Sequence, residues 1–317
     1  IEKGAFVMDP DFQRDFIWPR DKQSKLIESV LMRIPLPVFY LAEDDQGRMI
    51  VVDGLQRLST FQRFVNNQLK LSLPTQAELD GKHFENLSPK LQNRVEDCNL
   101  VLYVIDAKVP ERARLDIFER VNGGVPLTRQ QMRNCLYMGD ATRFLKVEAN
   151  AEVFLRATGK SLKKDTMRDR EFVNRFCAFQ ILSLDEYKGD MDDFLALSLR
   201  QMNKMSTEDL SRLSVQFRLA MSNAWAVFDK HAFRKRQRGQ TGRSVLNASL
   251  WDVMSTGLSR YSETVVESKT SELRDAYYEL MDDEHFLHAI TYGPNSTKQV
   301  KYRFAVMHAV LKGIFNA

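Results

Sequence analysis

Residues 51–60 read Val-Val-Asp-Gly-Leu-Gln-Arg-Leu-Ser-Thr, and this stretch decides the fold of the first part of the chain. An apolar, β-branched run that stops abruptly at Asp-Gly is typical of a strand ending in a tight turn. The aromatic and apolar residues Phe61, Phe64 and Val65 then follow at helical spacing. The stretch therefore predicts a strand, a turn and the N-terminus of a helix.

The predicted turn carries a carboxylate, an amide and a guanidinium, at Asp53, Gln56 and Arg57. The first turn of a helix presents free N–H groups and the positive end of the helix dipole, which suits a phosphate. The guanidinium fork matches phosphate oxygens, and a carboxylate is a ligand for a hard cation such as Mg²⁺. The alternative interpretation is structural: Asp53 caps the helix and Arg57 lies along its surface.

The composition is that of an ordinary globular protein. The chain has 317 residues, 44% of them hydrophobic and 28% charged, which allows two domains or one large one. No apolar run approaches the roughly 20 residues that a membrane span needs, and the first residues lack the pattern of a signal peptide. Three well-separated cysteines indicate buried thiols in a reducing compartment. We therefore expect a cytoplasmic protein without a membrane anchor; its net charge of +4 permits an acidic partner.

The first hundred residues combine predicted strands and helices, and the rest of the chain is helical. Strands are expected at 6–8, 38–41, 49–52 and 99–105, the last of them buried, and helices at 22–33 and 88–96. The second and third strands form a hairpin. From Pro110 onward the pattern is helical almost to the end. We predict an α+β fold with a small mixed-sheet domain at residues 1–108 and a larger all-helical domain at 109–317.

Two further segments of the chain carry residues suited to binding a nucleotide. Gln13, Arg14 and Trp18 follow the first strand, where an aromatic ring can stack on a base while the polar side chains reach phosphate or sugar. The alternative is a surface loop with a buried tryptophan. Arg120 and Asn122 lie at the end of a predicted helix. They either close the same pocket or belong to an ordinary helix C-terminus.

Residues 231–243 read His-Ala-Phe-Arg-Lys-Arg-Gln-Arg-Gly-Gln-Thr-Gly-Arg and contain no acidic residue. A basic run of this kind can contact the backbone of a nucleic acid. The candidate nucleic-acid-binding residues are Arg234, Lys235, Arg236, Arg238 and Arg243. The alternative is a solvated loop without a ligand.

Taken in order, these motifs resemble a known family. They are Phe12-Gln13-Arg14 with Trp18, Leu26-Ile27-Glu28-Ser29, Ile34-Pro35-Leu36-Pro37, residues 52–60 and Phe118-x-Arg120-x-Asn122. The set resembles the N-terminal domain family of the GmrSD-type modification-dependent restriction enzymes, which is related to the ParB/sulfiredoxin nucleotide-binding fold. Weaker similarity reaches 127–128, 133–134, 169–172 and 296–303, so the resemblance spans most of the chain.

The resemblance implies a ParB/sulfiredoxin-like domain that binds a nucleoside triphosphate and Mg²⁺ in phage defence. The family's Asp-Gly-Gln-Gln-Arg motif corresponds to residues 53–57, with Leu55 in place of the first glutamine, so binding is expected and hydrolysis stays open. The expected catalytic residues are Asp53, Gln56 and Arg57, with Asp53 also the metal ligand. The expected nucleotide-binding residues are Gln13, Arg14, Trp18, Gly54, Ser59, Thr60, Arg120 and Asn122.

The nuclease is expected to lie outside these residues. Many family members carry a C-terminal HNH nuclease, whose His/Asn cluster is not visible here. We therefore expect a nucleotide-binding, nucleotide-hydrolysing sensor or regulatory component that acts with a nuclease in a missing C-terminal region or in another protein. The resemblance also implies a nucleotide-responsive homodimer. Two alternatives stay open: a non-catalytic DNA-binding module, and a scaffold that holds a partner nuclease.

Overall fold

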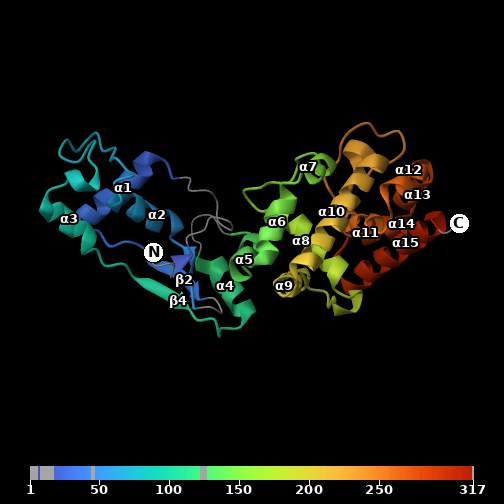
Figure 1. The fold of residues 1–317 in the computed structure, drawn as a ribbon, viewed down its shortest axis with the longest axis horizontal. Helices are drawn as coiled ribbons and strands as arrows, with labels where there is room; N and C mark the ends of the chain where they lie inside the picture. Colours follow the sequence, from blue (N-terminus) through green and yellow to red (C-terminus); the bar gives the residue numbers. More distant parts are fainter. Residues whose placement is uncertain (1–5, 8–17, 44–46, 122–126, 316–317) are drawn as a thin grey trace. The chain divides into compact units, whose positions relative to one another are not determined.

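The structure is a computed structural model that describes residues 6–7, 18–43, 47–121 and 127–315. The chain divides into two compact units, Ile1–Leu136 and Tyr137–Ala317. A small mixed sheet lies in the first unit, and helices make up the described part of the second, so the predicted α+β class is confirmed (Figure 1). The first unit extends beyond residue 108 and takes in two helices that we had expected in the second domain.

A four-stranded sheet forms the centre of the first unit, in the order β1-β3-β2-β4. Its strands are β1 (Phe6–Val7), β2 (Phe39–Glu43), β3 (Met49–Asp53) and β4 (Leu102–Ile105). Strands β2 and β3 pair antiparallel, as the predicted hairpin requires, whereas β1 runs parallel to β3 and β4 parallel to β2. Strand β3, which leads into the Asp-Gly turn, is therefore an inner strand of the sheet.

Strand β4 corrects the expectation of a buried strand at 99–105. It lies at an edge of the sheet, and Leu102, Tyr103 and Val104 are 39%, 55% and 48% exposed, whereas Ile105 is buried. The ring of Tyr103 stacks on that of Tyr40 in the neighbouring strand, with centroids 5.7 Å apart. A continuous apolar run indicates a strand, but it does not tell an edge strand from a central one.

Helix α2 packs against both the sheet and the other helices of the first unit. The described helices of this unit are α1 (Arg20–Leu31), α2 (Leu55–Val65), α3 (Pro89–Glu96), α4 (Glu111–Val121) and α5 (Arg129–Leu136), with the 3-10 turn η1 (Phe84–Asn86). Leu55 and Leu58 of α2 pack with Phe39 in a core against the sheet. Further along α2, Phe64 packs with Ile27 of α1 in a second core. The beginning of α2 is thus held by the sheet, and its end by the other helices.

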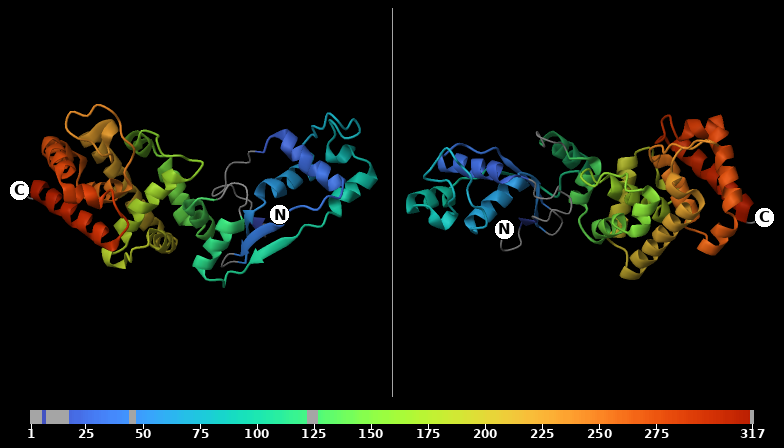
Figure 2. Two further views of the ribbon diagram at one scale, coloured as in Figure 1. Left: turned by 180° about the vertical axis from the view of Figure 1, so that it is seen from behind. Right: turned by 90° about the horizontal axis from the view of Figure 1, so that it is seen from above.

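The second unit is a bundle of helices, seen from two further sides in Figure 2. Its helices are α6 (Asp140–Ala149), α7 (Glu152–Thr158), α8 (Arg168–Ile181), α9 (Met191–Met202), α10 (Thr207–Phe228), α11 (Ala248–Leu258), α12 (Glu263–Ser268), α13 (Thr270–Asp282), α14 (Glu284–Ala289) and α15 (Thr297–Phe315), with the 3-10 turns η2 (Leu184–Glu186) and η3 (Asp229–His231). Within the described ranges, none of these helices combines the length and the apolar character needed to span a bilayer.

The core of the second unit surrounds Trp251 of α11. Rings of Phe154, Phe172, Phe217 and Phe233 lie with their centroids 4.5–6.3 Å from that of Trp251. These rings come from different helices and from the segment after η3. Aromatic contacts of this kind add to the stabilisation that apolar burial provides. The tryptophan therefore holds together segments that are far apart in the sequence.

A buried carboxylate lies next to this core. Asp252 accepts hydrogen bonds from Arg175 of α8, at 2.8 and 2.6 Å, and from Arg303 of α15, at 2.8 Å. All three side chains are at most 4% exposed. Burial lowers the pKa of Arg303, and Asp252 opposes this effect. One carboxylate thus joins α8, α11 and α15 and is shared as an acceptor by two buried guanidinium groups.

We expect Asp252→Asn to lower the free energy of unfolding by about 3–5 kcal/mol, because it leaves two buried guanidinium groups without a counter-charge. Urea unfolding followed by tryptophan fluorescence measures the change, since Trp225 and Trp251 both lie in this unit. The control is Asp275→Asn, which breaks the exposed pair with Arg238 and should change the free energy by less than about 1 kcal/mol. Equal effects of the two substitutions would contradict the role assigned to Asp252.

Candidate functional site

Gly54 forms the turn between β3 and α2. It has a φ of 101°, which favours glycine, and it is the N-cap residue of α2. A Cβ at this position would overlap with the ring of Phe39. The helix receives no side-chain cap, so the alternative interpretation in which Asp53 caps α2 is wrong. The first intrahelical bond runs from the Leu58 N–H to the Gly54 carbonyl, at 2.9 Å.

Arg57 is buried against the beginning of β2 rather than lying along the helix surface. Its Nη2 donates to Asp53 Oδ2 at 2.7 Å and to the Val38 carbonyl at 3.1 Å, and its Nη1 donates to the Pro37 carbonyl. The guanidinium carbon also lies 4.3 Å from the centroid of the Phe39 ring. Burial lowers the pKa of Arg57, and the Asp53 carboxylate opposes this effect. Arg57 thus cross-links the end of β3 to the segment that leads into β2.

Asp53 and Gln56 have different surroundings at the same turn. The Asp53 side chain is 33% exposed, and its Oδ2 is held by Arg57. Gln56 Oε1 accepts the backbone N–H of Trp18 at 3.1 Å, and the Trp18 carbonyl accepts from Gln23 Nε2 at 2.7 Å. The structure therefore brings the predicted residue Trp18 next to the beginning of α2 through its backbone.

The remaining predicted residues of this site differ in their placement. Thr60 is fully buried and donates to the Gln56 carbonyl at 2.7 Å, whereas Ser59 is half-buried. Arg120 is exposed on α4. Gln13, Arg14 and Asn122 lie outside the described residues. The structure thus groups Asp53, Gly54, Gln56, Arg57 and Trp18, and the assignment of a ligand to them stays a prediction.

A Mg²⁺ ion at this turn would have Asp53 as its protein ligand. In the part of the chain that the structure describes, no three His, Cys, Asp or Glu side chains come together as a metal site. Magnesium in nucleotide sites is held by one or two carboxylates together with phosphate oxygens and water. One partly exposed carboxylate beside a helix N-terminus fits that pattern, in which the nucleotide itself completes the coordination.

The basic run at 231–243 does not form one continuous surface. Arg234 is buried at 2% exposure, Lys235 donates to Thr291 and Arg238 pairs with Asp275. Arg236 donates to the Gln240 carbonyl at 3.2 Å, and Arg243 donates to the Thr158 carbonyl at 3.0 Å. The side chains of this run thus contact several different parts of the second unit. Their predicted contact with nucleic acid stays a prediction.

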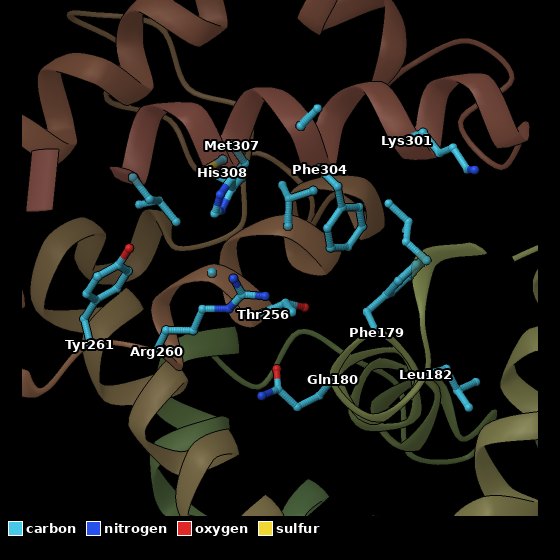
Figure 3. A pocket seen from close by; sticks show the side chains of 15 residues that line it. Phe179, Gln180, Leu182, Thr256, Arg260, Tyr261, Lys301, Phe304, Met307 and His308 are labelled. Carbon is cyan, nitrogen blue, oxygen red and sulfur yellow. The ribbon is translucent and has the colours of Figure 1, made fainter. Parts of the chain in front are cut away.

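The second unit also contains a cavity that our sequence analysis missed (Figure 3). It has a volume of about 440 Å³ and lies between α8, α11 and α15. Phe179 and Phe304 line it together with Gln180, Arg260 and His308. These residues come from helices that are distant in the sequence, and no local motif connects them. Only the tertiary packing brings them together.

We expect Arg57→Ala to lower the stability of α2 by about 2–4 kcal/mol, because Asp53 and two backbone carbonyls lose their donor. Hydrogen exchange of the α2 amides measures this change within the first unit. Arg57→Lys should restore only part of the loss, since an ammonium group lacks the planar fork. The control Lys25→Ala, at an exposed position of α1, should stay within about 0.5 kcal/mol. Unchanged protection of α2 in Arg57→Ala would refute the structural role.

The comparisons with known proteins bear on the first unit. Residues 1–138 match the family model described as the GmrSD restriction endonuclease, N-terminal domain. The matched range includes the whole β3–α2 turn. No curated protein and no solved structure matches the chain. The family predicted from the ordered motifs is confirmed. Residues 1–138 of this chain therefore belong to the GmrSD restriction endonuclease N-terminal domain family.

Proposed function

We propose that this chain is the nucleotide-binding component of a restriction system that acts against phage DNA. The membership of residues 1–138 in the GmrSD N-terminal domain family supports the role in restriction. In this proposal the first unit binds a nucleoside triphosphate with Mg²⁺ and regulates a nuclease. We place the nuclease in another protein or in another part of the natural protein.

The beginning of α2 carries this proposal. Gly54 is the N-cap residue of α2 and has no side chain with which to cap the helix. The first N–H groups of a helix also lack intrahelical partners, and the helix dipole adds positive potential. Phosphate groups bind at helix N-termini for these two reasons. In our proposal the triphosphate lies at this turn, beside the partly exposed carboxylate of Asp53.

The roles of the polar side chains follow from their contacts. Arg57 holds Asp53 Oδ2 and two backbone carbonyls, so we assign it as a positioning residue rather than as a free phosphate ligand. Asp53 would hold Mg²⁺ together with phosphate oxygens. Gln56 would orient the attacking water, as glutamines do in other nucleotide hydrolases. Leu55 is buried in the core against the sheet, which leaves Gln56 as the amide of the motif.

Calorimetric titration of the full chain with ATP, CTP, GTP and UTP in the presence of Mg²⁺ tests this proposal. We expect the wild-type chain to bind at least one of them. Asp53→Asn should weaken binding about tenfold or more, because it removes the charge of the Mg²⁺ ligand. An asparagine oxygen still accepts a hydrogen bond from Arg57, so this variant should keep the fold.

The matched control is Asp21→Asn, which removes an exposed carboxylate from the first turn of α1 in the same unit. This variant should bind the nucleotide like the wild-type chain. Absence of binding by the wild-type chain would overturn the proposal. Equal losses in Asp53→Asn and Asp21→Asn would show that the nucleotide lies elsewhere. Phosphate release by the wild-type chain but not by Gln56→Glu would support the hydrolytic role of Gln56.

A further inference from the structure

Two arginines of the basic run turn toward one cavity in the second unit. Arg234 and Arg243 both line a cavity of about 500 Å³, together with Lys163 and Arg168. No Asp or Glu is present among the described residues that line it. Arg168 forms an ion pair with Glu171 at 2.7 Å, but Glu171 does not line the cavity. The walls of the cavity are therefore strongly basic.

The guanidinium groups of Arg234 and Arg243 share the same acceptors. Nη2 of Arg234 donates to the Thr158 carbonyl at 2.8 Å and to Ser161 Oγ at 2.7 Å. Nη2 of Arg243 donates to the same two atoms, at 3.0 and 3.2 Å. Two like charges thus lie side by side at the end of α7, with neutral oxygens as their acceptors. Burial and the charge of Arg243 lower the pKa of Arg234 to about 10.

Gly159 makes this arrangement possible. It ends α7 with a φ of 60°, and a Cβ at this position would overlap with the guanidinium of Arg243. The Arg243 Nη2 also donates to the Gly159 carbonyl at 3.0 Å. Capping of the last carbonyls of α7 accounts for the Nη2 bonds to Thr158 and Gly159, but not for those to Ser161 Oγ. Nη1 of Arg234 donates to the Ser244 carbonyl, which leaves its Nε without a partner among the described residues.

Several donors of the cavity have no partner. The Nε of Arg234 is buried in a side chain that is 2% exposed, and it makes no hydrogen bond with any described residue. Nε and Nη1 of Arg243 and the ammonium of Lys163 have no protein partner in the described ranges either, but both of these side chains are exposed to solvent. Buried donors without acceptors are rare in folded proteins, and each is a reason to look for a ligand. An anion would supply both the acceptors and the missing negative charge.

We propose that this cavity binds the phosphate group of a nucleotide, either free or within a nucleic-acid strand. A phosphate group presents several strong acceptor oxygens and matches the fork of an arginine. Ser161, Thr166 and Ser244, which carry hydroxyl groups, also line the cavity. The cavity is larger than a phosphate needs, and Leu162 and Leu246 add apolar wall for the attached nucleoside. This inference is independent of the nucleotide site proposed in the first unit.

Titration of the full chain with inorganic phosphate, a mononucleotide and a short single-stranded DNA tests the proposal. Arg243→Gln should weaken the binding of each of these probes about tenfold or more, because charge-assisted hydrogen bonds are lost. Lys163→Gln should weaken it to a smaller extent. Both positions are exposed, and a thermal melt of each variant verifies that the fold is kept.

The matched control is Arg238→Gln, which removes an equal charge from the same loop at a residue paired with Asp275. It should bind the probes like the wild-type chain. Tighter binding of DNA, with a steep dependence on salt, would identify a strand as the source of the phosphate. Equal binding of the mononucleotide and the DNA would identify a free nucleotide.

Two results would overturn the proposal. One is the absence of binding of all three probes to the wild-type chain. The other is an equal loss of affinity in Arg243→Gln and Arg238→Gln, which would indicate a general effect of the surface charge.

Discussion

The candidate site in the first unit depends on the guanidinium of Arg57. It connects the Asp53 carboxylate at the end of β3 with the carbonyls of Pro37 and Val38, which lie just before β2. The ring of Phe39 packs against the guanidinium and against the place where a Gly54 Cβ would lie. One side chain thus fixes the hairpin, the turn and the first turn of α2 together. The orientation in which Asp53 would meet a cation is a consequence of this cross-link.

The second unit uses arginines in two contrasting ways. Arg175 and Arg303 are buried around the carboxylate of Asp252, which supplies a charge and accepts from both. Arg234 and Arg243 lie beside backbone carbonyls and hydroxyls, with no acidic side chain in the described lining of their cavity. Burial of a charge without a counter-charge is costly. The first group has a carboxylate among its acceptors, whereas the acceptors of the second group are neutral oxygens, so the second group gains from an added anion.

The sequence predicted local features well and tertiary placement less well. The strand, turn and helix at residues 51–60 and the hairpin of β2 and β3 were predictable, because alternation and turn residues are local signals. The exposure of β4 was not, since burial depends on which strands are its neighbours. Likewise, a basic run shows its charge in the sequence but not the direction of each side chain. The burial of Arg234 arises from contacts with Thr158 and Ser161, which are distant in the chain.

Leu55, the departure from the family's motif, has a structural explanation. It is buried with Leu58 in the core against the sheet, where an amide side chain would lose its hydrogen bonds to water. Residues three apart in a helix share a face, so Gln56 is directed elsewhere. Gln56 Oε1 accepts the backbone N–H of Trp18. If Gln56 orients water in the proposed reaction, this hydrogen bond would couple its side chain, and through it the nucleotide, to the segment that contains Trp18.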